Sequence, residues 1–352
     1  MFLVFLLAAA IWAGGAYLGA PREQRVTFLT GLFFVVLAIQ IVLPETHPLR
    51  QATGGDPALW MLFGGFVLLW LGYRQVLRLL RGRVEPVAVT APKPETFSPT
   101  ELSRYARHIV LRELGGPGQK ALREAKVLVI GAGGLGAPGL QYLAAAGVGT
   151  IGVIDDDAVE NANLQRQVIH RDADIGLPKV FSAKAAMEAQ NPFIEVRPYH
   201  RRLTEEIAQE LIAEYDLVLD GSDNFDTRYL VNRACVATAT PLISGALSQW
   251  EGQLSLFDPA RGGPCYACVF PEPPAPGLAP SCAEAGVLGP LPGVVGSMMA
   301  VEAVKAIAGI GTSLRGKLLI YDALHGETRL VAIAKRADCP VCAGVGPEPQ
   351  SD

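Results

Sequence analysis

Lys126-Val-Leu-Val-Ile-Gly-Ala-Gly-Gly-Leu-Gly136 is the stretch that decides the fold, because a short apolar strand runs directly into a glycine-rich turn. A helix is expected next, from Gly134 to about Gly147. Free N–H groups and the positive end of the helix dipole favour an anionic ligand at the turn. Glycine permits the tight turn and lets the backbone approach a phosphate or ribose closely, which applies to Gly131, Gly133, Gly134 and Gly136. The stretch predicts a nucleotide site in a Rossmann-like α/β fold with a doubly wound, mainly parallel sheet.

Three acids follow a second predicted strand. Thr150–Ile154 ends in Asp155-Asp156-Asp157. The first of these lies about twenty residues beyond the glycines, a spacing at which a carboxylate reaches the ribose hydroxyls. Taken alone, the two features favour an NAD-dependent oxidoreductase. The alternative is a glycine-rich turn without a ligand, which any doubly wound sheet can contain.

Charged side chains further along favour a triphosphate over NAD. Arg166 closely follows the second strand, Lys179 opens a predicted helix, and Asp223 follows another apolar strand, 216–220. Strand ends on one edge of a parallel sheet meet at one crevice. There the two cations would neutralise phosphate charge and the acid would hold Mg²⁺. An NAD enzyme would also need a proton-transfer group and usually a separate substrate domain, and we recognise neither in the sequence.

From about Phe97 to Gly344 the chain resembles the MoeB/ThiF/HesA group of E1-like adenylyltransferases. The motifs that carry the resemblance occur in family order. They are Arg104-Tyr-Ala-Arg-His-Ile-Val-Leu111, Gly131-Ala-Gly-Gly-Leu-Gly136, Asn163-Leu-Gln-Arg-Gln167, Gly176-Leu-Pro-Lys179, Asp223-Asn224 and two Cys-x-x-Cys pairs. Together they are far more specific than the glycine turn alone.

The resemblance implies an enzyme that uses ATP to adenylate the C-terminal glycine of a ubiquitin-like sulfur carrier. Within the group the chain most resembles MoeB, which implies a MoaD-like carrier and molybdenum cofactor biosynthesis. A ThiS-type carrier of the thiamine pathway is also open. Catalytic roles are implied for Arg166, Lys179 and Asp223, and for Arg107 across a homodimer. The residues implied to contact ATP or Mg²⁺ are Gly131, Gly133, Gly134, Gly136, Asp155, Asp157, Ala162, Asn163, Leu164, Gln165, Arg166, Lys179, Asp223 and Asn224.

Four cysteines form two Cys-x-x-Cys pairs, Cys265 with Cys268 and Cys339 with Cys342. Four thiolates are the ligand set of a closed structural zinc site, which takes no part in chemistry. The alternative is two disulfides or loose thiols, which a reducing compartment disfavours.

Two further cysteines stand apart from these pairs. Cys235 lies in an apolar helical stretch and is expected to be a small core residue. Cys282 lies in a proline- and glycine-rich loop and resembles the position of a thiol used in thioester or persulfide chemistry. A cysteine that adenylation does not need is the alternative for this position.

Three apolar runs precede the enzyme, over about 2–20, 26–43 and 57–73. Each approaches the ~20 residues that cross a bilayer. The first run has no positive n-region, and further apolar runs follow, so a cleaved signal peptide is not expected. Arginines gather after runs one and three: Arg22, Arg25, Arg74, Arg78, Arg81 and Arg83. By the positive-inside rule the N-terminus would be outside and the enzyme cytoplasmic, on a multi-pass anchor in the inner membrane.

These features divide the chain into a transmembrane region over 1–83, a proline-rich linker over 84–97 and an adenylyltransferase domain over 98–346. The expected partners are a sulfur carrier ending in Gly-Gly, the lipid bilayer, a separate sulfur donor and a second copy of the chain. A formal net charge of −4 gives no support to nucleic-acid binding. The alternative of another class is a membrane-anchored module that binds a carrier without adenylating it.

Overall fold

The computed structural model describes residues 2–81, 96–275 and 285–346. The chain divides into two compact units, Met1–Lys93 and Pro94–Asp352. Most of the predicted linker at 84–97 and the cysteine Cys282 lie outside the described residues.

The first unit is helical: α1 (Phe2–Tyr17), α2 (Arg22–Val42), α3 (Pro48–Thr53) and α4 (Pro57–Arg81). Its helices pack around the buried side chains of Val4, Val36 and Trp60. The short helix α3 was not predicted, and it is tied to its neighbours by hydrogen bonds. Gln40 donates to the Thr53 hydroxyl over 2.7 Å, and the Trp60 indole donates to the Thr53 carbonyl over 3.0 Å.

The third predicted run, 57–73, lies within α4, which continues through the arginines to Arg81 without a break. Arginine is a good helix former, so the end of an apolar run is not the end of a helix. Among the described residues, three helical stretches are long and apolar enough to cross a membrane: Glu23–Val42, Pro48–Val76 and Pro290–Ala308. Within the most apolar segment of each stretch, 11%, 6% and 44% of the residues are buried, in the same order. The third stretch is therefore a core helix of the second unit. Helix α1 is shorter.

An eight-stranded sheet forms the centre of the second unit, in the order β3-β2-β1-β4-β5-β6-β7-β8. Strands β1 to β5 are parallel, and β6 to β8 continue the sheet antiparallel. This confirms the predicted doubly wound, mainly parallel sheet. The strands are β1 (Lys126–Ile130), β2 (Thr150–Ile154), β3 (Glu195–Tyr199), β4 (Leu217–Asp220), β5 (Leu242–Leu247), β6 (Glu251–Phe257), β7 (Lys317–Asp322) and β8 (Glu327–Ala332).

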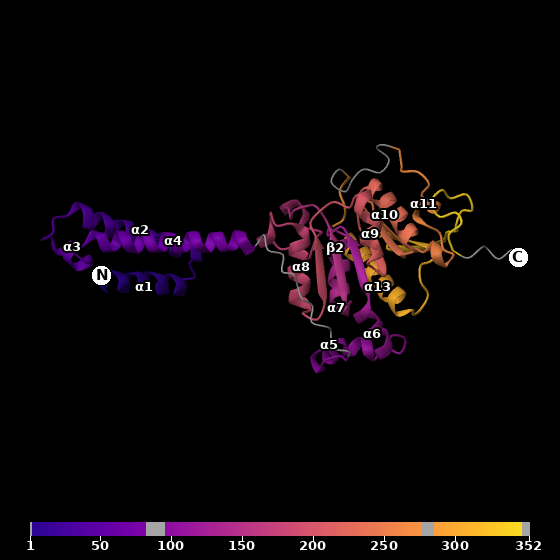
Figure 1. Ribbon diagram of the computed structural model, residues 1–352, viewed down its shortest axis with the longest axis horizontal. Coiled ribbons are helices and arrows are strands. Elements are labelled where there is room, and N and C mark those ends of the chain that lie inside the picture. Colours follow the sequence, from indigo (N-terminus) through magenta and orange to yellow (C-terminus); the bar gives the residue numbers. More distant parts are fainter. Residues whose placement is uncertain (1, 82–95, 276–284, 347–352) are drawn as a thin grey trace. The chain divides into compact units, whose positions relative to one another are not determined.

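Helices cover both faces of this sheet (Figure 1). The described helices of the unit are α5 (Pro99–Ile109), α6 (Gly115–Glu124), α7 (Gly136–Ala146), α8 (Lys179–Gln190), α9 (Glu205–Ala213), α10 (Phe225–Thr238), α11 (Tyr266–Val269) and α13 (Pro290–Ala308), with 3₁₀ turns η1 (Asn161–Asn163), η2 (Asp172–Asp174) and η3 (Pro259–Arg261). Of these, α5 packs on α6 and α6 on α13, at one end of the unit (Figure 1).

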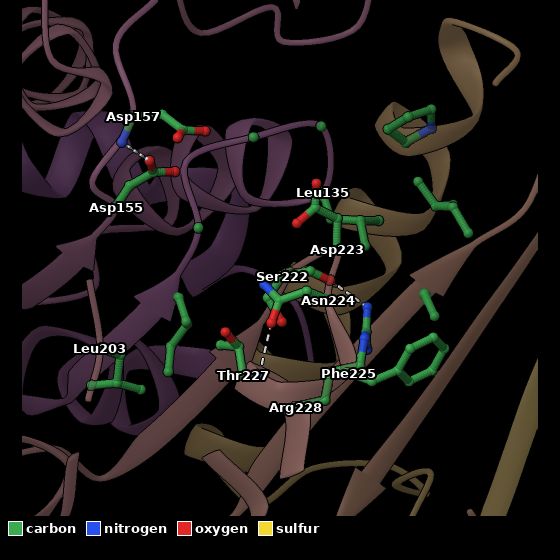
Figure 2. Close-up of a pocket in the computed structure, with 18 of the residues that line it drawn as sticks. Leu135, Asp155, Asp157, Leu203, Ser222, Asp223, Asn224, Phe225, Thr227 and Arg228 are labelled. Atoms are coloured by element: carbon green, nitrogen blue, oxygen red, sulfur yellow. Dashed lines mark hydrogen bonds between the residues drawn. The ribbon is translucent and has the colours of Figure 1, made fainter. Parts of the chain in front are cut away.

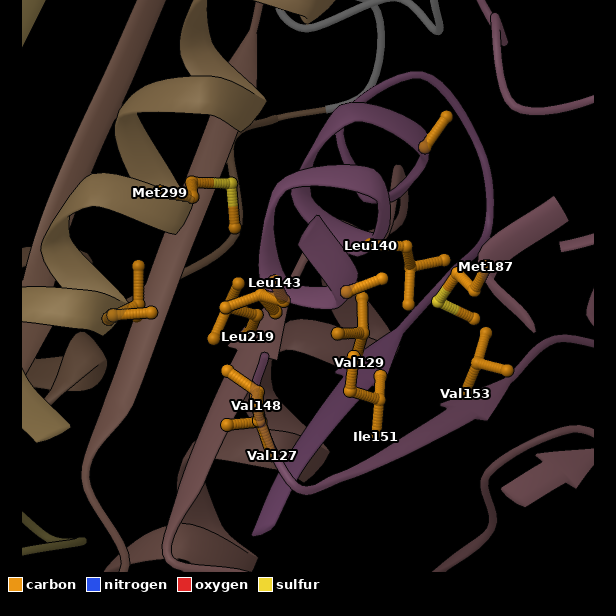
Figure 3. Packing of buried hydrophobic residues seen from close by; sticks show 14 of the residues in the cluster. Val127, Val129, Leu140, Leu143, Val148, Ile151, Val153, Met187, Leu219 and Met299 are labelled. Carbon is orange, nitrogen blue, oxygen red and sulfur yellow. The ribbon is translucent and has the colours of Figure 1, made fainter. Parts of the chain in front are cut away.

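Successive strand residues point to opposite faces and build two cores. Val127 and Val129 of β1 pack with α7, α8 and α13 (Figure 3), whereas Leu128 and Ile130 pack with α9 and α10. Strands buried on both faces explain why β1 and β2 read as continuous apolar runs. Helix α7 ends where Gly147 adopts the left-handed conformation, φ 82°. The carboxyl ends of the parallel strands therefore lie along one edge of the sheet.

Candidate functional site

The glycine turn leaves β1 in a conformation that side chains disfavour. Gly131 has φ 88°, and a Cβ on Gly136 would lie 1.9 Å from the Gly131 carbonyl oxygen. Glycine at Gly136 is therefore needed for the packing of α7 on the turn. Between these positions, the Ala132 N–H donates to an Asp155 carboxylate oxygen over 2.8 Å. The turn is thus tied to the end of the neighbouring strand β2.

A cavity of about 730 Å³ opens at the carboxyl ends of β1, β2 and β4. The chain winds in one direction through β1, β2 and β3 and then crosses to β4 on the other side of β1. Ligands of such sheets bind at this switch point, and the volume lies within the usual range of small-molecule sites, roughly 300–1,000 Å³. Figure 2 shows Asp155 and Asp157 on one side of the cavity and Asp223, Asn224 and Arg228 on another.

The cavity is lined on one side by an acidic residue, Asp155, and a basic residue, Lys179. Asp155 accepts hydrogen bonds from the backbone N–H groups of Ala132 and Asp157, each over 2.8 Å. Burial raises the pKa of the Asp155 carboxyl above its ordinary value. The Lys179 ammonium is almost fully buried and lies 2.7 Å from a carboxylate oxygen of Asp157, whose side chain is 65% exposed. Asp157 is therefore a solvent-exposed counter-ion, whose interaction with Lys179 is open to competition from an anionic ligand.

Arg166 lines the cavity with a half-buried side chain. Its guanidinium donates to the Ala162 carbonyl over 3.2 Å and to the Asn163 side-chain oxygen over 3.1 Å. Neither partner carries a charge, so the guanidinium keeps its full attraction for an anion. Asn163 does not line the cavity itself. It contributes by holding Arg166.

The loop after β4 carries an exposed acid over a buried ion pair. Asp223 is exposed, lines the cavity and has no ion pair with any residue that the structure describes. Beneath the loop, Asp220 accepts hydrogen bonds from the Ser222 N–H and hydroxyl over 2.9 and 2.6 Å. Arg228 is buried, and its guanidinium lies 3.7 Å from Asp220. It also donates to the carbonyls of Ser222 and Gly245, which ties the loop to β5.

Most of the predicted site residues surround this one cavity. Those that line it are Gly131, Gly133, Gly134, Asp155, Asp157, Arg166, Lys179, Asp223 and Asn224. Those that do not line it are Gly136, Ala162, Asn163, Leu164, Gln165 and Arg107. Arg107 lies exposed on α5, so its predicted role across a dimer stays a prediction.

Other residues that line the cavity were not predicted from the sequence: Arg201, Arg202, Arg228, Gln253 and Tyr266. Arg228 carried a usable signal, since the apolar residues Tyr229, Leu230 and Val231 follow it directly in the helix and an arginine is rarely buried without a partner. Tyr266 lies next to Cys265, and burial raises the pKa of its phenol to about 12. It is therefore protonated at neutral pH.

The four paired cysteines meet in one buried cluster. Sulfur atoms lie 3.8 Å apart between Cys265 and Cys268, 3.6 Å between Cys265 and Cys339, and 3.4 Å between Cys268 and Cys342. Zn–S bonds of about 2.3 Å in a tetrahedron place sulfurs roughly 3.8 Å apart, whereas a disulfide needs about 2.05 Å. The cluster is consistent with structural zinc, and the disulfide alternative is wrong. Cys235 is buried elsewhere, in the core beside α9 and α10, as predicted.

Comparisons with known proteins agree with this geometry. A model of the ThiF family matches residues 105–341. A sulfur carrier protein adenylyltransferase of Thermus thermophilus is 51% identical over 253 residues, covering 71% of this chain and 92% of that protein. The SAMP-activating enzyme E1 of Haloferax volcanii is 49% identical over 247 residues, covering 70% and 91%. The adenylyltransferase and sulfurtransferase MOCS3 of Bos taurus is 48% identical, covering 76% of this chain and 58% of the bovine protein.

Solved structures agree on the fold. A crystal structure of E. coli MccB superposes with a TM-score of 0.62 at 23% identity, covering 73% of this chain and 76% of that one. A crystal structure of PaaA gives a TM-score of 0.59 at 22% identity, covering 75% and 82%. At these identities the likeness bears on the fold alone.

Proposed function

Since the chain belongs to the ThiF family, we propose that it transfers AMP from ATP to the C-terminal glycine of a ubiquitin-like sulfur carrier and releases pyrophosphate. It is a sulfur carrier adenylyltransferase, and so a nucleotidyltransferase. The carrier we propose is a MoaD-like protein of molybdenum cofactor biosynthesis. A ThiS-type carrier of another sulfur-transfer pathway is the alternative, and the assay below includes both.

The carrier's terminal carboxylate is ionised at neutral pH, so the reaction needs no general base. A carboxylate oxygen attacks the α-phosphorus in line, forming the acyl–phosphate bond while the bond to the β-phosphate oxygen breaks. Negative charge then shifts onto the departing pyrophosphate, where Arg166 and Lys179 would stabilise it. Asp223 would hold Mg²⁺, which when bound offsets phosphate charge. In this scheme the triphosphate replaces Asp157 as the partner of Lys179.

The observation that carries the proposal is the meeting of two cations, an unpaired acid and an anion-binding glycine turn around a single cavity. Arg166 and Lys179 come from separate segments, and Asp223 follows a third. A carrier-binding module without activity would have no need of this charge arrangement. An oxidoreductase would need a proton-transfer group facing the nicotinamide.

ATP–pyrophosphate exchange with purified full-length chain tests the activity. We expect exchange that depends on a carrier ending in Gly-Gly, and a comparison of MoaD-like with ThiS-like carriers identifies the pathway. Arg166→Ala should lower the exchange rate about a hundredfold, since one preorganised contact contributes ~3 kcal/mol to the transition state. Arg171→Ala, an exposed arginine nearby that does not line the cavity, is the matched control. If the chain binds the carrier without catalysing exchange, the result would support a non-catalytic carrier-binding module. If the chain binds NAD in place of ATP, the result would support an oxidoreductase.

We also propose that the first unit anchors the enzyme in the cytoplasmic membrane, with the second unit in the cytoplasm. Large apolar side chains on its helices are exposed, including Phe28, Phe34 and Ile41 on α2 and Phe66 and Leu69 on α4. In water this surface would be unfavourable by about 25 cal/mol per Å², whereas lipid would cover it. The arginines at the ends of the apolar runs support the orientation.

Fractionation tests the anchor. The full-length chain should sediment with membranes and resist alkaline carbonate, whereas a fragment of residues 97–352 should be soluble and retain adenylation. The fragment keeps every residue assigned to ATP or zinc and serves as the control for activity. Full-length protein in the soluble fraction without detergent would contradict the proposal.

A further inference from the structure

His170 lies among three segments that surround the cavity, although it does not line the cavity itself. Its ring is buried, with 6% of the residue exposed. Nε2 lies 2.9 Å from the Ala132 carbonyl oxygen in the glycine turn, and Nδ1 lies 2.9 Å from the Ser182 hydroxyl on α8. Helix α8 begins with Lys179, and His170 itself follows the segment that carries Arg166.

The partners of the ring determine where its proton sits. A carbonyl oxygen can only accept a hydrogen bond, so Nε2 carries the hydrogen and donates it to Ala132. The Ser182 hydroxyl has a single hydrogen, which is shared between Nδ1 at 2.9 Å and a carboxylate oxygen of Asp174 at 2.8 Å, so the hydroxyl links the far side of the ring to η2. The imidazole is therefore held on both sides and cannot rotate away from the turn.

The Ala132 residue is held at both of its polar groups. Its N–H donates to Asp155 at the end of β2, and its carbonyl accepts from His170. Gly133 and Gly134 follow directly and line the cavity. Glycine-rich backbone has more conformational freedom to lose than any other. Without both bonds, the N–H groups of these two glycines would not be fixed toward a ligand.

We propose that His170 is a positioning residue for ATP: its Nε2–H fixes the Ala132 carbonyl, so that Gly133 and Gly134 present their backbone to the phosphates. The inference rests on the proposed function for the identity of the ligand. It predicts an effect on ATP binding, because the ring bonds to the glycine turn, which in the proposed function faces the phosphates.

Two substitutions separate positioning from packing. In His170→Gln the amide nitrogen reaches the place of Nε2 and can still donate to Ala132. In His170→Asn it reaches only the place of Nδ1, so the bond to Ala132 is lost. Both remove ring volume, and both should lower the melting temperature. His170→Phe keeps the volume and loses both bonds, so the comparison holds even where the asparagine variant fails to fold.

Calorimetric titration of the full-length chain with Mg²⁺·ATP measures the effect. We expect roughly tenfold weaker ATP binding for His170→Asn and His170→Phe, the cost of one lost hydrogen bond with an unsatisfied carbonyl, and near-native binding for His170→Gln. The carrier's KM in the exchange assay should stay unchanged in all three. Equal ATP affinity across the variants would show that His170 only packs, and would leave the proposed function intact. Failure of the wild-type chain to bind ATP would overturn the proposed function and this inference together.

Discussion

Replacing Arg228 with methionine should destabilise the second unit, because it leaves the buried Asp220 carboxylate without its cation. Arg228 contacts Asp220 at 3.7 Å and donates to the Ser244 hydroxyl over 3.0 Å and to the Gly245 carbonyl over 2.8 Å. Asp220 is 1% exposed, so its carboxylate would remain buried without a cation. Breaking a buried pair in this way costs about 3–5 kcal/mol of unfolding free energy. At about 2–4 °C per kcal/mol, the melting temperature should fall by about 6–20 °C.

Urea unfolding of the 97–352 fragment measures the change, and a second substitution isolates its cause. Asp220→Asn in the Arg228→Met background removes the unpaired charge and should restore part of the loss. Arg233→Met is the matched control: the same helix carries it, but its side chain is 49% exposed and pairs with Glu205. Its effect should be within about 1 kcal/mol. A loss below about 1 kcal/mol for Arg228→Met, or additive effects in the double variant, would refute the reasoning.

Cys265→Ser should release zinc and lower the melting temperature, because metal binding contributes directly to folding. Metal analysis measures the zinc content, and Cys235→Ser is the control. Wild-type protein without about one zinc per chain would contradict the prediction. Mixing inactive Arg107→Ala and Asp223→Ala chains should restore ATP–pyrophosphate exchange, because one site of each heterodimer would be intact. If mixed dimers form and no activity returns, Arg107 does not act in the partner's site. Burial lowers the pKa of His170, so stability should be complete above about pH 6.5 and fall with pH below it as the unfolded chain takes up the proton. Urea midpoints at about pH 7.5 and 5.5 should differ more for wild type than for His170→Gln, and an equal difference would exclude His170 as the source.

The parts of the site that local patterns specify were predictable. Strand β1, the glycine turn and strand β2 have the bounds expected from the sequence, because each is a short apolar run ended by glycines or acids. Strand β3 was missed, because Pro198 interrupts its pattern. The structure tolerates this proline because β3 lies at the edge of the sheet and pairs only with β2.

Contacts between distant segments were not predictable in the same way. Arg228 lies on helix α10, and its burial depends on Asp220 of β4 and Ser244 of β5. Asn163 belongs to a motif that reads as a ligand contact, yet in the fold its side chain faces Arg166. A motif indicates which residues gather at a site, whereas only the tertiary arrangement distinguishes those that touch the ligand from those that hold them.

The cysteine cluster sets an order of events during synthesis. Cys265 and Cys339 are 74 positions apart, and α13, β7 and β8 lie between them. At about 5–20 residues per second, the ribosome adds that interval in several seconds, during which the first pair has no second pair to meet. Tyr266, which lines the cavity, adjoins Cys265: its N–H donates to the Asn232 side-chain oxygen over 2.8 Å, and its ring packs on Phe257 and Phe270. The cluster beside Tyr266 therefore cannot form until β8 has been synthesised, and a chain that stops short of Cys339 lacks the second pair.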